Sequence, residues 1–177
     1  MFQHQGIVSS LKYKRQPVVD RYFKGAKIVR RKKYYTINPP AEIDTTMVSY
    51  EDYKAEHAYK ISDLYFWAVS PQKGQTYTIV LQERTNLTAL IIVGGFPTRK
   101  TDFIANGDVL ISSSEHCTEW TKMGTLVKGG FNSRDSKDKT MMHNVLKDVT
   151  CIQIEVTKSQ NNWAILSEFA LLQGTIK

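Results

Sequence analysis

The sequence predicts an all-β domain, an antiparallel β-sandwich or jelly roll, that follows a basic N-terminal segment. About eight short segments are rich in β-branched and aromatic residues, and clusters of Gly, Pro, Ser and Asn separate them. No stretch keeps a helical period over many residues. With 177 residues, 41% of them hydrophobic and 23% charged, the chain has a globular composition and enough length for a buried core.

The N-terminal segment is set apart by its charge and by the lack of any sustained hydrophobic period. Residues 1–35 hold ten basic side chains and one acidic side chain, a formal charge of +9, so the rest of the chain carries −2 of the total of +7. The Asn-Pro-Pro at residues 38–40 ends this segment, because proline keeps the preceding residue extended and donates no hydrogen bond. We therefore predict a basic strap at residues 1–37 and a β-sandwich domain at residues 38–177.

The expected strands follow one another along the second segment. Residues 41–48 alternate in part, residues 64–69 are short and aromatic, and residues 76–81 are rich in β-branched side chains. Residues 88–93 are almost continuously apolar, which is typical of a strand buried on both faces. The series of short strands separated by turns predicts antiparallel sheets. The remaining strands are expected at residues 109–111, 120–127, 149–156 and 163–172.

The sequence contains none of the motifs that would predict catalysis. There is no glycine-rich nucleotide loop, no Gly-x-Ser-x-Gly elbow and no histidine or cysteine spacing suited to zinc. No apolar run approaches the roughly 20 residues of a membrane-spanning helix, and the N-terminus does not resemble a signal peptide. We expect no catalytic residues and no required cofactor.

Two further features depend on the compartment of the protein. Cys117 and Cys151 are expected to be buried thiols, with one disulfide as the alternative in an oxidising compartment. The triplet from Asn86 to Thr88, Asn-Leu-Thr, is an acceptor sequence for N-glycosylation, and it has a meaning only in a secreted or lumenal protein.

Two stretches resemble the discoidin-like (coagulation factor type C) domains. One is residues 110–114, LISSS, followed after a turn by residues 119–121, EWT; the other is residues 62–67, SDLYFW. The resemblance implies a jelly-roll sandwich of the galactose-binding-domain-like type, which binds ligands through loops at one end. It also implies that Asp63 lies where a structural cation binds in that superfamily. A capped turn explains Asp63 equally well, so a metal site near Asp63, with calcium as the ion, is left open.

A second resemblance covers almost the whole chain. Residues 38–42 (NPPAE), 65–71 (YFWAVSP) and 163–168 (WAILSE) are similar to the C-terminal region of the N-acetylglucosaminyltransferase IV family. Residues 2–6 (FQHQG) and 9–11 (SSL) are similar to the last segment of the catalytic domain of that family. These enzymes start the β1,4-GlcNAc branch on the α1,3-mannose arm of N-glycans in the Golgi.

This second resemblance implies a non-catalytic, lectin-like module that recognises GlcNAc-terminated N-glycans. The N-terminal strap would be the tail of a catalytic domain, which is the expected protein partner. The expected location is the Golgi lumen, as part of a type II membrane protein, or the extracellular space after cleavage. We expect no nucleic-acid partner and no direct membrane insertion.

Five residues are the candidates for the sugar site. Asp102 matches the sugar-binding aspartate of the family, although here Thr101 replaces the glycine that precedes this aspartate in relatives; pairing with Arg99 or Lys100 is the alternative role. Phe96 and Arg99 share its loop, and Phe96 could stack on a sugar or anchor the loop. Trp163 and Asn162 are expected at the same end, as sugar contacts or as core and turn residues. Trp67 and Trp120 are expected in the core.

Two other functions remain as alternatives. A discoidin-type membrane or protein adhesion module would use Phe96, Arg99 and Lys100 as an apolar spike with basic neighbours. A nucleic-acid site would use the basic residues 24–33 with the adjoining Tyr34 and Tyr35, since phosphate contacts and aromatic stacking occur together in such sites. A solvated strap, or a strap that contacts an acidic surface of the catalytic domain, explains these charges without nucleic acid.

Overall fold

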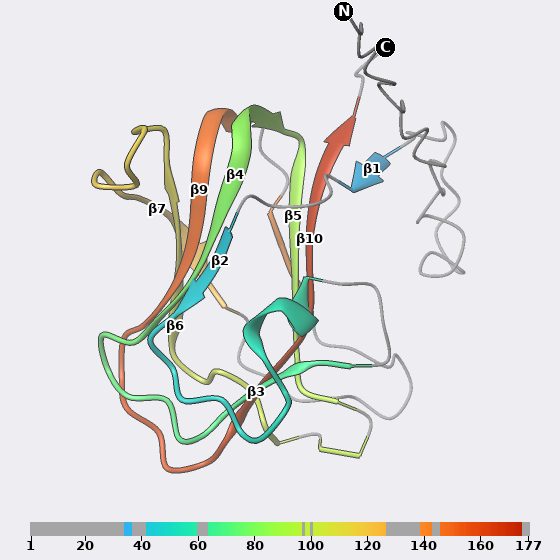
Figure 1. Cartoon of the computed structure of the whole chain (residues 1–177), viewed down its shortest axis with the longest axis vertical. Helices are drawn as coiled ribbons and strands as arrows, with labels where there is room; N and C mark the ends of the chain where they lie inside the picture. Colours follow the sequence, from blue (N-terminus) through green and yellow to red (C-terminus); the bar gives the residue numbers. More distant parts are fainter. Residues whose placement is uncertain are drawn as a thin grey trace, which may run out of the picture.

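The structure is a computed structural model, which describes residues 34–36, 42–59, 64–96, 98–99, 101–126, 139–142 and 146–174. In this part of the chain, ten strands form two antiparallel sheets that pack face to face as a sandwich (Figure 1). The described residues also contain one short 3₁₀-helix, η2 (Ala55–Ala58). The predicted all-β sandwich is confirmed, and no helix in the described part of the chain has the length and apolar character needed to cross a membrane.

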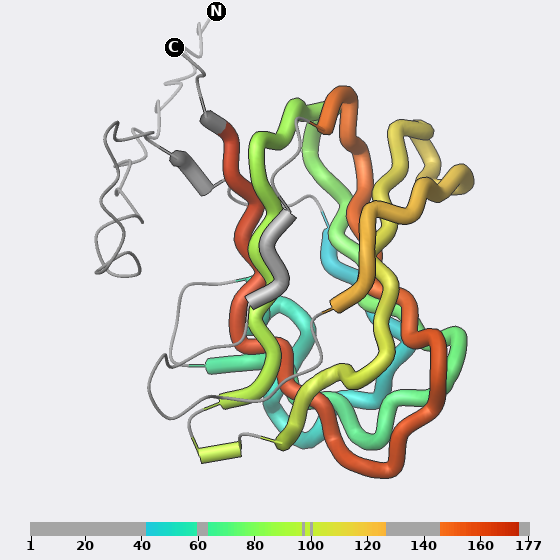
Figure 2. The backbone as a smooth tube through the Cα atoms, turned by 180° about the vertical axis from the view of Figure 1, so that it is seen from behind, coloured from blue at the N-terminus to red at the C-terminus, as the bar shows by residue number. Residues whose placement is uncertain are grey.

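Each sheet has five strands. In the first sheet the order is β1-β10-β5-β8, and β3 also pairs with β10; in the second the order is β2-β4-β9-β6-β7. Strands that are neighbours in a sheet are often far apart in sequence, as Figure 2 shows for the central part of the sandwich. The bounds are β1 (Tyr34–Thr36), β2 (Glu42–Thr45), β3 (Phe66–Ala68), β4 (Thr76–Leu87), β5 (Ala89–Gly94), β6 (Gly107–Ser112), β7 (Thr121–Thr125), β8 (Lys139–Met142), β9 (Leu146–Val156) and β10 (Ala164–Gly174).

The main core lies between the two sheets. In β9, Ile152, Ile154 and Val156 are fully buried in it, because alternate side chains of a strand face the same side. In β5, the nearly continuous apolar run is buried as predicted, with Leu90 and Ile92 in the core. Tyr77 connects the core to η2, because its hydroxyl donates a 2.8 Å hydrogen bond to the carbonyl of Ala55. Burial raises the pKa of Tyr77 strongly, which keeps the phenol neutral.

The strand β4 is longer than its sequence predicts. The pattern indicated a strand at residues 76–81, but β4 continues to Leu87 through the exposed residues 82–84. Its second half pairs with β9 at Thr85 and Leu87, with one register shift before Thr85 and a second before Leu87. A polar stretch on an exposed strand has no apolar alternation, so the sequence pattern misses it.

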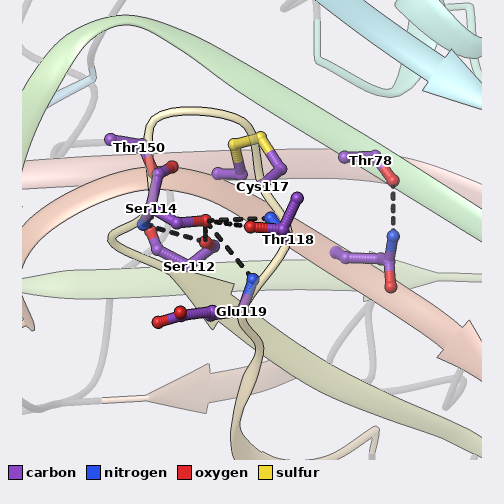
Figure 3. The surroundings of a disulfide bond; sticks show 9 residues. Thr78, Ser112, Ser114, Cys117, Thr118, Glu119 and Thr150 are labelled. Atoms are coloured by element: carbon purple, nitrogen blue, oxygen red, sulfur yellow. Dashed lines mark hydrogen bonds between the residues drawn. A yellow bond between two sulfur atoms is a disulfide. The ribbon is translucent and has the colours of Figure 1, made fainter.

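A disulfide joins Cys117, in the loop between β6 and β7, to Cys151 in β9, which confirms the alternative of one disulfide over that of two thiols (Figure 3). The Ser112–Ser114 part of the discoidin-like motif holds the same loop. Ser114 Oγ accepts hydrogen bonds from the amides of Thr118 (2.8 Å) and Glu119 (3.3 Å). Thr150 Oγ1 donates to the carbonyls of Ser112 and Ser114. The two cysteines therefore tie a hydrogen-bonded loop to the central strand of the second sheet.

The predicted domain boundary lies outside the described residues, as do residues 1–33 of the strap. Tyr34, Tyr35 and Thr36 form β1, which pairs with the end of β10 at Gly174, Gln173 and Leu172. The strap and the boundary at residues 38–40 stay predictions.

Candidate functional site

Six aromatic side chains gather at the end of the sandwich where β5 and β9 end and β10 begins. We call them the aromatic cluster. Its rings are close: the Tyr50 and Trp163 centroids are 4.7 Å apart, those of Trp67 and Trp163 4.8 Å, and those of Tyr65 and Phe96 4.5 Å. The cluster packs on Ile165 and is separate from the main core. The members are Tyr50, Tyr53, Tyr65, Trp67, Phe96 and Trp163.

The cluster forms because strand alternation gives β3 and β10 two apolar faces. Phe66 and Ala68 belong to the main core, whereas Tyr65 and Trp67 belong to the aromatic cluster. In β10, Ile165 lies on the cluster side and Leu166 in the main core. Trp67 is buried, with 6% of its surface exposed, so it is a packing residue as predicted, but at the end of the sandwich and outside the main core.

The loop at residues 95–106, which we call the site loop, lies beside this cluster. It starts at Gly95, whose φ of 74° is a conformation that favours glycine. A tight turn follows, in which the Arg99 amide donates to the Phe96 carbonyl (2.9 Å) and the Asp102 amide donates to the Arg99 carbonyl (3.2 Å). The Gly95 amide donates to the Ile165 carbonyl, and the Ile165 amide donates to the Asp102 carbonyl, both at 3.0 Å. Both ends of the turn are thus attached to the start of β10.

Gln160 fixes the site loop to the β9–β10 connection. Its side chain is 8% exposed, and its Oε1 accepts a 3.0 Å hydrogen bond from the Ala105 amide. Its Nε2 donates to the carbonyls of Phe103 (3.0 Å) and Asn162 (3.1 Å). Because both polar atoms of the buried amide are satisfied by main-chain groups, Gln160 holds two loops in one arrangement.

Asp102 is partly exposed, and Thr101 Oγ1 donates a 3.3 Å hydrogen bond to its Oδ1. The Arg99 guanidinium lies over the Trp67 ring, 5.0 Å from the centroid, in a cation–π contact. Both charges act on Tyr65: burial and a hydrogen bond with Tyr53 raise the pKa of Tyr65, Arg99 lowers it and Asp102 raises it. One carboxylate and one guanidinium therefore lie at the edge of the aromatic cluster.

The structure brings all five candidate residues to one end of the sandwich, at the bottom in Figure 1. Phe96 is half-buried against Tyr65, which is the contact expected of a loop anchor. Asn162 is exposed and its Nδ2 donates to the Thr101 carbonyl at 3.1 Å, the contact expected of a turn residue. Trp163 is half-buried on Tyr50 and Trp67. These contacts leave the sugar roles of the five residues as predictions.

Several residues of this end were not predicted. Tyr50, Tyr53 and Tyr65 complete the aromatic cluster, and Gln160 connects the loops. The sequence offered one signal for this cluster, the two tyrosines of the short charged segment at residues 50–53. Aromatic side chains in a loop usually pack on a partner, so these tyrosines could have predicted a second apolar cluster. Trp120 is partly buried and lies in none of the apolar clusters formed by the described residues, so its core assignment is wrong.

The described residues include no group of three or more His, Cys, Asp or Glu side chains that could hold a metal ion. Asp63 and Lys100 lie outside the described residues. The metal site near Asp63 and the basic pair of Arg99 and Lys100 therefore stay predictions.

Solved structures show the fold of the sandwich. The F5/8 type C domain of a Bacteroides fragilis protein matches with a TM-score of 0.62 at 14% identity, over 81% of this chain and 98% of that chain. A CBM32 domain of a family 31 glycoside hydrolase from Clostridium perfringens has a TM-score of 0.59 at 13% identity, over 76% and 96%. The CBM32 domains of another protein from that organism, solved in complex with GalNAc, have a TM-score of 0.60 at 14% identity, over 76% and 34%. The fold is therefore the discoidin-like sandwich.

Curated relatives cover nearly the whole chain. Mouse alpha-1,3-mannosyl-glycoprotein 4-beta-N-acetylglucosaminyltransferase C is 29% identical over 97% of this chain and 35% of its own length. Chicken alpha-1,6-mannosyl-glycoprotein 4-beta-N-acetylglucosaminyltransferase is 28% identical over 97% of this chain and 36% of its own length. This chain thus spans about a third of the length of these enzymes. The family model described as the MGAT4 C-terminal domain matches residues 41–168, so the chain belongs to the MGAT4 C-terminal domain family.

Proposed function

We propose that this chain is a carbohydrate-binding (lectin) module that recognises GlcNAc-terminated N-glycans. It is the non-catalytic C-terminal part of a β-1,4-N-acetylglucosaminyltransferase, and it binds sugar at the end formed by the site loop and the aromatic cluster. The names of the relatives and the complex of a CBM32 neighbour with GalNAc support a sugar as the ligand class.

The observation that carries the proposal is a partly exposed carboxylate beside partly buried aromatic rings. The main chain of Asp102 is bonded to Ile165, and Asn162 is bonded to the neighbouring Thr101, so Asp102 lies next to the segment that carries Trp163. A carboxylate accepts strong hydrogen bonds from adjacent sugar hydroxyls. Aromatic rings offer an apolar face to the C–H groups of a sugar ring. A carboxylate for hydrogen bonds and aromatic rings for stacking, the two kinds of contact typical of sugar sites, are therefore present at one place.

The compartment is part of the proposal. A disulfide such as Cys117–Cys151 persists in the secretory pathway and outside the cell and is rare in the cytosol. It supports a lumenal location, either the Golgi lumen or the extracellular space after cleavage. Lumenal glycoproteins would then be the substrates that the module brings to the catalytic domain.

The adhesion alternative has less support among the described residues. An adhesion spike needs an apolar side chain that projects into the membrane or partner. Phe96 instead packs on Tyr65, and Arg99 lies over Trp67, so both are held against the molecule. Binding to anionic liposomes that is lost in Arg99→Ala would favour this alternative over the sugar site.

The test is calorimetric titration with GlcNAc and with a GlcNAc-terminated N-glycan. We expect Asp102→Ala to weaken binding about tenfold or more, since a hydrogen bond to a charged group contributes roughly 1.5–3 kcal/mol. The matched control is Asp44→Ala, which removes an exposed carboxylate from β2 and should leave the affinity unchanged. Absence of GlcNAc binding by the unmodified chain, or an unchanged affinity in Asp102→Ala, would sink the proposal.

A further inference from the structure

Asn86 lies in the Asn-Leu-Thr triplet at residues 86–88, which is the sole N-glycosylation acceptor sequence in all 177 residues. We propose that Asn86 carries an N-linked oligosaccharide, which is added while the chain is being made. The inference rests on the lumenal compartment and is independent of whether the module binds sugar.

The geometry of Asn86 leaves room for an attached sugar. Its side chain is exposed, near the end of β4. Its Oδ1 accepts a 2.9 Å hydrogen bond from the amide of Asp148, which fixes the orientation of the carboxamide. No described residue bonds to the Nδ2 atom, which is the atom that an N-linked sugar modifies. The linkage replaces one hydrogen on Nδ2 and leaves Oδ1 in place, so the bond to Asp148 survives the modification.

The hydrogen bonds of this segment indicate that the modification takes place before the chain folds. In the folded chain, Thr88 is bonded twice to Leu172: its amide (2.8 Å) and its hydroxyl (3.0 Å) both donate to the Leu172 carbonyl. The transferase needs this hydroxyl accessible in a flexible triplet, so the folded state is a poor acceptor. However, Leu172 follows Thr88 by 84 residues, and Asp148 follows Asn86 by 62. At roughly 5–20 residues per second, the triplet stays without these partners for several seconds during synthesis.

The reaction is a substitution at the anomeric carbon of an oligosaccharide linked to a lipid pyrophosphate. A bond forms between Asn86 Nδ2 and this carbon, the bond from the carbon to the pyrophosphate oxygen breaks, and Nδ2 loses one proton. The lipid pyrophosphate leaves with the electron pair of the broken bond. The donor and the transferase are supplied by the lumen of the secretory pathway.

The position of Asn86 keeps this glycan away from the candidate sugar site. The connection from β4 to β5 lies at the upper end of the sandwich in Figure 1, and the β9–β10 loop, which Gln160 bonds to the site loop, lies at the lower end. The attached oligosaccharide therefore leaves the site loop and the aromatic cluster accessible to an external ligand.

The experiment expresses the whole chain behind a secretion signal in a eukaryotic cell and measures its mass before and after removal of N-glycans by an amidase. We expect a single amidase-sensitive increase in mass and conversion of Asn86 to Asp in the released chain. Asn86→Gln and Thr88→Ala should abolish the increase. Thr88→Ser keeps the acceptor triplet and should retain it, which separates loss of the acceptor from a defect in folding.

A positive control uses Asp44→Asn, which creates a second acceptor triplet with the exposed Thr46. We expect this variant to gain a second glycan. The proposal is overturned if the control variant is glycosylated at position 44 alone while Asn86 stays unmodified. It is equally overturned if the glycan of the unmodified chain persists in Asn86→Gln.

Discussion

At the residue scale, Gln160 decides the arrangement of the candidate site. Its side-chain hydrogen bonds go to residues outside the aromatic cluster. They join the site loop to the segment that carries Asn162 and Trp163. A buried amide with three main-chain partners is costly to remove, because each partner left unsatisfied costs about 1–3 kcal/mol. Gln160 is therefore a positioning residue for Asp102.

We expect Gln160→Leu to lower the free energy of unfolding by about 2–4 kcal/mol, because the apolar side chain leaves three main-chain groups without partners. GlcNAc binding should weaken as well, since the site loop loses its attachment. Urea denaturation and titration with GlcNAc measure the two effects. The control Gln153→Leu removes one hydrogen bond, to Thr78 Oγ1, and should have a smaller effect on stability and none on binding.

At the element scale, the two ends of the sandwich have different roles. One end holds the aromatic cluster and the site loop, and the other holds the disulfide-bonded loop between β6 and β7 (Figures 1 and 3). The disulfide closes a segment of 34 residues, and a closure of this length stabilises a fold by about 3–4 kcal/mol in the chain-entropy model. The disulfide therefore stabilises the end of the sandwich that lies opposite the candidate site.

The double variant Cys117→Ala/Cys151→Ala tests this division. We expect thermal and chemical denaturation to show a loss of about 2–4 kcal/mol in the free energy of unfolding. The affinity of the folded variant for GlcNAc should stay the same, because the disulfide lies away from the site loop. A matching loss of affinity in the folded variant would contradict the division.

The same scale shows what the sequence could predict. Strands with a strong apolar pattern, such as residues 88–93 and 149–156, were placed correctly because burial selects their side chains directly. The polar half of β4 and the contact between Tyr50 and Trp163 were not predicted, since they depend on partners far away in the sequence. Asp102 could be proposed as a candidate from the family resemblance, whereas Gln160 carries no motif.

At the scale of the whole molecule, the uneven charge is separate from the proposed ligand. The formal charge of +9 lies on residues 1–35 and the remaining −2 on the rest of the chain, which includes the candidate site. The proposed ligand, a terminal GlcNAc, is a neutral sugar. The excess of basic residues therefore gives no reason to expect an anionic ligand at the site.

Salt dependence distinguishes the proposed sugar binding from the two alternative functions. We expect GlcNAc affinity to change less than about twofold between roughly 50 mM and 200 mM salt, since no phosphate counterions are released. A nucleic-acid ligand held by residues 24–33 would lose affinity steeply over the same range. Binding to anionic liposomes would also weaken, because surface charges are screened.

The central claim is that a sugar binds at the site loop and the aromatic cluster, and nuclear magnetic resonance tests it most directly. In a ¹⁵N-labelled chain titrated with GlcNAc, we predict that amide shifts change at residues 95–106 and 160–165 and at the indole of Trp163. Amides of the disulfide-bonded loop around Cys117 should stay unchanged. Shift changes confined to the Cys117 end, or no change at saturating GlcNAc, would contradict the account.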